Sequence, residues 1–133
     1  MQQEYVELAR QAQKVSENAY TPYSHFNVGC AVLTQTGEVF LGANIENASY
    51  GLSNCAERSA LFNAFSNAKN PNIKALAVWT KQGNVFPCGA CRQVILELAP
   101  KADIIINDKN GNLNIYKISE LLPHCFDQSD LNK

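Results

Sequence analysis

The sequence predicts an α/β protein in which a mixed sheet of five strands lies between helical layers, a three-layer α-β-α arrangement. Three observations predict this fold class. Apolar residues recur at three- and four-residue steps in four segments, as they do in amphipathic helices. Five shorter segments are rich in Val, Ile and Leu, as strands are. The two kinds of segment alternate along 133 residues, a length that suits one domain spanning residues 1–133.

The first predicted helix carries Tyr5, Leu8 and Ala12 on one side. It stops before Pro22, because the residue that precedes a proline avoids helical geometry. Pro100 ends the third predicted helix in the same way. The four predicted helices cover residues 4–19, 55–68, 88–99 and 118–122.

Two turn signals join neighbouring strands into hairpins. Thr36-Gly37 follows the first apolar run, and Asn110-Gly111 precedes the last one. Residues 42–54 are polar and are expected to form a loop, and loops of this length are often functional. Hairpins that flank β-α-β units make the sheet mixed. The predicted strands cover residues 27–34, 38–41, 75–80, 103–107 and 113–116.

Composition and charge limit the class of partner. The formal net charge is −1 and the sequence has no cluster of Lys and Arg. We therefore expect a small-molecule substrate and no nucleic-acid partner. No apolar run is long enough to span a bilayer, and residues 1–5 lack the features of a signal peptide. We therefore expect a cytoplasmic protein without a membrane partner. Its five cysteines are then better interpreted as thiols or metal ligands than as disulfides.

Three of these cysteines lie at or just inside predicted helix starts. Cys88 and Cys91 form a Cys-x-x-Cys pair after Pro87, and Cys55 begins another helix. The positive end of a helix dipole favours thiolate over thiol, so three thiolates are available for one Zn²⁺. Three protein ligands with one position open is the pattern of catalytic zinc, whereas structural zinc normally has four.

An open zinc position holds water, whose pKa the metal lowers to about 7. The resulting hydroxide needs a proton acceptor that is not itself a ligand. Glu57 follows Cys55 by two residues and is predicted to take that proton and pass it to a substrate.

Other interpretations of these residues exist. Glu57 alone fits a capping box with Asn54, and Cys88 with Cys91 fits a thioredoxin-like redox pair. The former leaves the nearby cysteines unexplained, and the latter leaves Cys55 unexplained. A structural zinc module would need a fourth ligand, which His25 or His124 would supply; such a module would bind a partner rather than catalyse. Cys30 and Cys125 are expected to be packed or incidental thiols.

Cys-Ala-Glu at 55–57 followed by Pro-Cys-Gly-Ala-Cys-Arg-Gln at 87–93 strongly resembles the signature of the cytidine deaminase family, in particular the small homotetrameric type. The resemblance extends from the first helix to Phe126. It implies the cytidine-deaminase-like fold and one Zn²⁺ per chain. It also implies a hydrolase that acts on a cyclic amidine C–N bond, converting free cytidine and deoxycytidine to uridine and deoxyuridine plus ammonia in pyrimidine salvage.

The resemblance also assigns substrate-binding residues. Phe26 matches the aromatic residue that packs against the pyrimidine, and Asn44 with Glu46 matches the pair that hydrogen-bonds the ribose hydroxyl. The backbone N–H of Ala56 is expected to bind the base carbonyl. Tyr50 and Phe126 match residues that reach the active site of a neighbouring subunit.

The chain departs from the family pattern at two places. Cys30 stands where the family often has a small residue, and Asp127-Gln128 stand where Gly-Pro often follows Phe126. The first departure is expected to be harmless, and the second bears on the assignment of Phe126.

Three thiolates leave the zinc site net negative. Arg58 and Arg92 directly follow Glu57 and Cys91, so we predict that at least one of them donates to a ligand sulfur and offsets that charge. The alternative for each is an exposed helix arginine.

Enzymes of the same superfamily act on two further kinds of substrate. One is a base within a nucleic acid, which the near-zero charge disfavours. The other is a cytosine-containing antibiotic such as blasticidin S. Asn44, Glu46 and the sequence Cys-Ala-Glu-Arg at 55–58 favour the free nucleoside.

Overall fold

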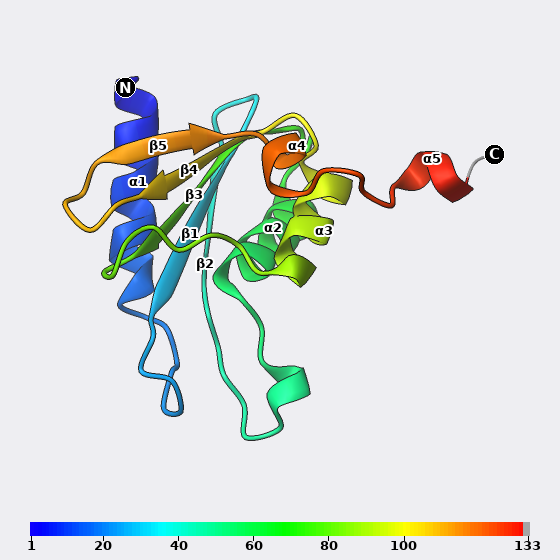
Figure 1. The fold of residues 1–133 in the computed structure, drawn as a ribbon. Coiled ribbons are helices and arrows are strands. Elements are labelled where there is room, and N and C mark those ends of the chain that lie inside the picture. Colours follow the sequence, from blue (N-terminus) through cyan, green and yellow to red (C-terminus); the bar gives the residue numbers. More distant parts are fainter. Residues whose placement is uncertain (132–133) are drawn as a thin grey trace.

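The structure, a computed structural model, describes residues 1–131 and confirms the predicted mixed five-stranded sheet with helices on both faces. The strand order across the sheet is β2-β1-β3-β4-β5 (Figure 1). The strands are β1 (Val28–Thr34), β2 (Val39–Ala43), β3 (Ile73–Thr80), β4 (Asp103–Asn107) and β5 (Leu113–Tyr116). The helices are α1 (Gln3–Ser16), η1 (Tyr50–Leu52, a 3₁₀ turn), α2 (Ala56–Asn67), α3 (Gly89–Leu98), α4 (Ile118–Leu121) and α5 (Gln128–Leu131).

One strand pair, β3 with β4, is parallel and the other pairs are antiparallel. A parallel pair needs a crossover, which α3 supplies. The hairpin turns contain Gly37 and Gly111, whose φ angles of 93° and 85° are strained for residues that carry a Cβ atom. The predicted turn signals are thus confirmed.

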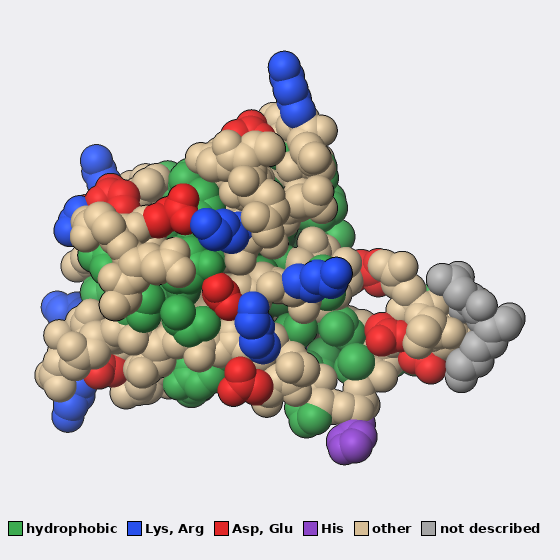
Figure 2. Space-filling model, turned by 90° about the horizontal axis from the view of Figure 1, so that it is seen from above, with side chains coloured by type: hydrophobic (Ala, Val, Ile, Leu, Met, Phe, Trp, Pro, Cys, Tyr) green, Lys and Arg blue, Asp and Glu red, His purple; other side chains and the backbone are tan. Residues whose placement is uncertain are grey.

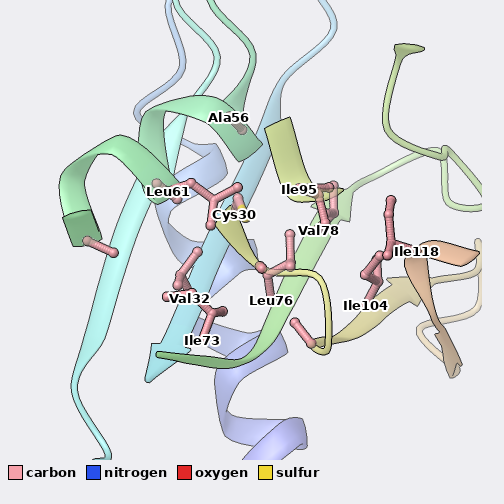
Figure 3. Packing of buried hydrophobic residues seen from close by; sticks show 14 of the residues in the cluster. Cys30, Val32, Ala56, Leu61, Ile73, Leu76, Val78, Ile95, Ile104 and Ile118 are labelled. Carbon is pink, nitrogen blue, oxygen red and sulfur yellow. The ribbon is translucent and has the colours of Figure 1, made fainter. Parts of the chain in front are cut away.

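Two apolar clusters fix the three layers. On one face α1 places Tyr5, Leu8 and Ala12 against β1, β3 and β4. On the other face α2, α3 and α4 pack on the same strands, as Figure 3 shows from close by. The side chains that meet there include Cys30, Val32, Ala56, Leu61, Ile73, Leu76, Val78, Ile95, Ile104 and Ile118.

Helix α2 lies unusually close to β2 because of a glycine. A Cβ atom built on Gly42 would lie 2.4 Å from the backbone nitrogen of Ala60 and 2.8 Å from the carbonyl oxygen of Ala56. Only glycine permits this approach, so Gly42 sets the height of α2 above the sheet. The start of α2, which carries Cys55 and Glu57, is placed accordingly.

Several boundaries differ from the predicted ones. Helix α1 ends at Ser16 and not at residue 19, because the amides of Glu17, Asn18 and Ala19 bond to carbonyls only three residues back. Strand β2 continues to Ala43, since Gly42 and Ala43 pair with β1 and are buried. The sequence did not indicate η1 or α5.

The last described segment leaves the body of the molecule. After α4 the chain runs outward to α5, which stands off from the sheet (Figures 1 and 2) and contacts α3, where the Gln128 side chain donates to Glu97. Among residues 1–131, no helix has the length and apolar character needed to cross a bilayer.

Candidate metal centre and active site

Two helix starts bring three thiols together. Cys55 is the N-cap residue of α2 and Cys88 that of α3, while Cys91 lies in the first turn of α3. Their sulfur atoms all lie within 4.8 Å of one another, and the Sγ atoms of Cys55 and Cys88 are 3.8 Å apart. Within residues 1–131 this is the one group of such side chains close enough to share a metal ion.

The three thiols fit zinc. Two sulfurs that are each about 2.3 Å from one tetrahedral Zn²⁺ lie about 3.8 Å apart, which matches the Cys55–Cys88 separation. Thiolates are also ligands that select zinc over hard cations. His25 and His124, the expected donors of a fourth ligand in a structural site, are not members of the group found in the described part of the chain. The cluster therefore fits one Zn²⁺ per chain held by three protein ligands.

The two arginines differ in what they contact. Arg58 donates from Nη2 to the Sγ atom of Cys55 at 3.4 Å. Hydrogen bonding from Cys91 and from Arg58 lowers the pKa of the Cys55 thiol to about 5. Arg92 instead donates from Nε to the carbonyl oxygen of Pro87 at 2.7 Å and from Nη1 to that of Leu121 at 2.6 Å. Arg58 thus lies at the sulfur cluster, whereas the hydrogen bonds of Arg92 hold the backbone before Cys88.

Glu57 is a buried carboxyl group beside the cluster. Only 5% of it is exposed, and burial raises its pKa to about 7. It is the second residue of α2, whose N-cap is Cys55, and that helix start has no side-chain cap hydrogen bond. The side chain of Asn54 donates to Ser59. The capping box that was the alternative for Glu57 is therefore absent from this helix.

A cavity of about 200 Å³ adjoins Cys55, Cys88 and Glu57. Its wall includes six of the residues that the sequence assigned to the site. Four further apolar residues that the sequence reasoning did not name also line it: Val28, Val78, Val85 and Phe86. Phe86 directly precedes Pro87-Cys88, and this adjacency was the available signal. The predicted residues in the wall are Phe26, Asn44, Cys55, Ala56, Glu57 and Cys88.

Asn44 already has backbone partners in this structure. Its Oδ1 atom accepts from the amide of Val28 at 2.8 Å, and its Nδ2 atom donates to the carbonyl of Phe26 at 2.8 Å. It therefore holds Phe26 against the start of β1. One lone pair and one amide hydrogen of Asn44 lie beyond these two bonds.

Glu46 lies outside the cavity, in a separate hollow that Tyr50 also lines. Its carboxylate accepts from the amides of Tyr23 and Ser24 at 3.1 and 3.2 Å and from the Ser24 hydroxyl. These hydrogen bonds lower the pKa of Glu46, so it is a carboxylate near neutral pH. It joins the segment after α1 to the segment after β2.

Two predicted residues lie away from the cavity of their own chain. Tyr50 is 77% exposed and Phe126 is 59% exposed. Tyr50 contacts the edge of the Tyr23 ring, and Phe126 lies in the C-terminal segment. Cys30 is fully buried in the core, and Cys125 is not a member of the sulfur cluster.

Three thiols at two helix starts, with the Glu57 carboxyl group in the adjoining cavity, match the pattern of zinc-dependent base deaminases. Residues 2–107 match the family described as the cytidine and deoxycytidylate deaminase zinc-binding region, and the chain belongs to this family. The match includes the three cysteines and Glu57 and ends before Phe126.

Individual relatives agree with this membership. The cytidine deaminase of Halalkalibacterium halodurans is 46% identical over 126 residues, which are 94% of this chain and 96% of that protein. The cytidine deaminase of Sporosarcina psychrophila is 42% identical, over 94% and 93% of the two chains. The crystal structure of cytidine deaminase from Burkholderia pseudomallei superimposes with a TM-score of 0.86 at 43% identity, covering 95% of this chain and all of the other.

Proposed function

We propose that this chain removes the 4-amino group of free cytidine and deoxycytidine by hydrolysis, giving uridine and deoxyuridine plus ammonia. The chain would act as a single domain, in the cytoplasm, and would serve pyrimidine salvage. The observation that carries the proposal is the buried carboxyl of Glu57 in a cavity of about 200 Å³ whose wall includes Cys55 and Cys88. The names of the two relatives described above, which are cytidine deaminases at 46% and 42% identity, support the same substrate.

The roles of the chain's own groups follow from chemistry. Zn²⁺ held by Cys55, Cys88 and Cys91 would supply a hydroxide nucleophile near neutral pH. Glu57 takes a proton from the attacking water on its carboxylate oxygen and delivers it to the ring nitrogen N3. In a second transfer it takes the remaining proton from the hydroxyl group added at C4 and gives it to the amino nitrogen, which leaves as ammonia while the C4 carbonyl forms. Burial favours this because it raises the carboxyl pKa to about 7, so both protonation states are accessible at neutral pH.

Binding and orientation are assigned to the cavity wall. Phe26 packs against the pyrimidine ring, and the N–H of Ala56 donates to the base carbonyl. As the first residue of α2, Ala56 has an N–H that the helix itself does not use. The unused hydrogen-bonding capacity of Asn44, together with Glu46, holds the ribose hydroxyl. The surrounding apolar side chains exclude water from the reacting atoms.

We also propose that the chain works as a homotetramer with shared active sites, in which Tyr50 and Phe126 complete the pocket of a neighbour. Their exposure in one chain supports this, because large aromatic rings in contact with water are typical of interfaces.

The shape and charge of the molecule favour a free nucleoside over a polymer. A cavity of about 200 Å³ is small even for a ligand site. On the face drawn in Figure 2, Lys and Arg side chains are interspersed with Asp and Glu and form no stripe that would follow a phosphate backbone. A cytosine-containing antibiotic such as blasticidin S is the alternative substrate within the same chemistry.

The test compares wild type with Glu57→Gln. We expect one zinc per chain in both proteins, loss of cytidine absorbance with formation of uridine in the wild type, and loss of turnover by at least about a hundredfold in the variant. Glu7→Gln, which changes an exposed glutamate on α1, is the matched control and should keep full turnover.

Zinc without turnover of cytidine or deoxycytidine would exclude these substrates and favour the antibiotic or a structural metal site. Equal turnover by Glu57→Gln would exclude Glu57 as the proton carrier.

A further inference from the structure

Phe86 is a large apolar side chain in the cavity wall, and the proposed function gives it no role. It lies in the segment between β3 and α3, two residues before Cys88, and it is 38% exposed. Phe26 reaches the same cavity from the segment between α1 and β1. The cavity thus has two aromatic walls that come from different parts of the chain.

The backbone on each side of Phe86 is anchored. The amide of Asn84 donates to the carbonyl of Asn107 at 2.7 Å, and the carbonyl of Pro87 accepts from Arg92 at 2.7 Å. Asn107 is buried, and its side chain exchanges hydrogen bonds with the backbone N–H and carbonyl of Thr80 at 3.2 and 2.8 Å. The segment that carries Phe86 is therefore tied to the ends of β3 and β4.

The ring of Phe86 is braced as well. It meets Tyr116 of β5 edge-to-face, with ring centroids 5.1 Å apart and an interplanar angle of 75°. This arrangement is a favourable one for two aromatic rings. A ring held in this way keeps its position when the cavity is empty, so it is preorganised for a ligand.

We propose that Phe86 is a specificity-determining residue that contacts the base of the substrate and limits how large a base the pocket accepts. The inference rests on the proposed function and deepens it. A planar ring fits between aromatic walls, and a cavity of about 200 Å³ is small for a ligand site, so a bulky side chain in its wall restricts the size of the base that it admits. The substrate class is therefore a pyrimidine nucleoside without bulky ring substituents, and Tyr116 is the positioning residue for Phe86.

The experiment measures steady-state kinetics of zinc-loaded Phe86→Ala and Phe86→Leu with cytidine, 5-iodocytidine and N4-methylcytidine. The two analogues carry extra bulk at different ring positions. Loss of a ring contact made equally in ground and transition states should raise KM for cytidine about tenfold in Phe86→Ala with little change in kcat. The preference for cytidine over at least one analogue, as a ratio of kcat/KM, should fall about tenfold. Phe86→Leu should fall between Phe86→Ala and wild type.

Controls separate contact from general damage. Phe65→Ala removes an equally exposed ring, 38%, from α2 outside the cavity and should leave KM unchanged. Tyr116→Phe keeps the ring contact and should behave as wild type, whereas Tyr116→Ala should raise KM in the same direction as Phe86→Ala. Zinc content and oligomeric mass are measured for every variant.

Wild-type KM and an unchanged preference in Phe86→Ala would overturn the inference while leaving the deaminase proposal intact. Loss of zinc in both Phe86 variants would also overturn it, in favour of a purely structural role beside Cys88. If the wild type does not turn over cytidine, the proposed function fails and the inference fails with it.

Discussion

Three thiolates on one divalent cation leave a net negative charge, and Arg58 is the cation that the structure places beside them. Its Nη2 atom donates to Cys55, and its Nε atom is buried without a hydrogen-bond partner in the structure. Burial of this Nε atom without a partner is unfavourable, and the attraction between the guanidinium and the sulfur atom offsets that cost. Arg58 is therefore placed to act on a bound metal through Cys55, and we propose that it is a positioning residue.

We predict that Arg58→Gln weakens zinc binding by roughly tenfold to a hundredfold, the usual effect of removing a partner of a metal ligand. Competition with a chromophoric chelator measures this directly and does not depend on activity. Arg10→Gln is the control, because Arg10 is exposed and pairs only with Glu7 on α1. Zinc affinities that are equal in wild type and Arg58→Gln would show that the contact with Cys55 does not stabilise the bound metal.

The metal ligands could be predicted from the sequence, but the contacts of other site residues could not. Cys55, Cys88 and Cys91 were predictable because a ligand set has a spacing that few other roles require. The different contacts of Arg58 and Arg92 could not be predicted from the sequence, because each arginine follows a site residue by one position. Only tertiary packing brings the carbonyl of Leu121, from a different helix, to Arg92. Phe86 was missed for a similar reason: on its own, an apolar residue before Pro-Cys does not show which surface it faces.

At the scale of elements, one carboxylate links three parts of the fold. Asp103 at the start of β4 accepts from the Tyr5 hydroxyl of α1 at 2.6 Å and pairs with Lys117, which follows β5, at 2.6 Å. Lys117 first, and then Tyr5, lower the pKa of Asp103. The carboxylate form is therefore favoured in the folded state, and the resulting stability is present above the ordinary Asp pKa of about 3.9. That stability is lost as the pH falls through the lower, folded-state pKa.

We predict that Asp103→Asn lowers the free energy of unfolding by about 1 kcal/mol at pH 7, and that the difference from wild type narrows below about pH 4. Urea titrations at several pH values and constant ionic strength measure both quantities. Release of metal in acid affects both proteins, so it cancels in the difference. Glu7→Gln removes an exposed pair and should shift stability little at any pH. If the difference in free energy of unfolding between wild type and Asp103→Asn stayed constant down to pH 2.5, the pH-dependent stability would not come from Asp103.

Elements were predictable where periodicity and turn chemistry agree. Strands β4 and β5 were predicted with their observed bounds, because Asn110-Gly111 fixes the turn between them. Strand β2 was predicted to end two residues too early, since Gly42 and Ala43 owe their burial to α2, which lies later in the chain. Helix α5 has four residues with no buried side chain, so no apolar pattern marks it.

At the scale of the whole molecule, the exposed aromatic residues require an explanation. Tyr50 begins η1 in the segment between β2 and α2, and Phe126 lies between α4 and α5, in the segment that leaves the body of the molecule (Figure 1). Neither lines the cavity of its own chain. The carbonyl of Phe126 accepts from the side chain of Gln93 at 2.9 Å, so the backbone is tethered to α3 while the ring faces water. A symmetric assembly in which these rings enter neighbouring pockets would bury them.

This assembly predicts complementation between two defective chains. Phe126→Ala and Glu57→Gln should each lose most activity as homo-oligomers. Co-refolded in equal amounts, they should recover up to about a quarter of wild-type turnover, because half of the sites keep Glu57 and half of those meet an intact Phe126 from a neighbour. The readout is turnover against mixing ratio, with the mass of the assembly measured by light scattering.

The control for complementation combines Glu57→Gln with the double variant Phe126→Ala/Glu57→Gln. No site in that mixture has Glu57, so it should stay inactive, which excludes recovery through refolding alone. If single variants that form tetramers fail to complement, Phe126 acts within its own chain or not at all. A monomeric wild type with full activity would exclude shared sites altogether, and Tyr50 and Phe126 would then be surface residues whose exposure has no part in catalysis.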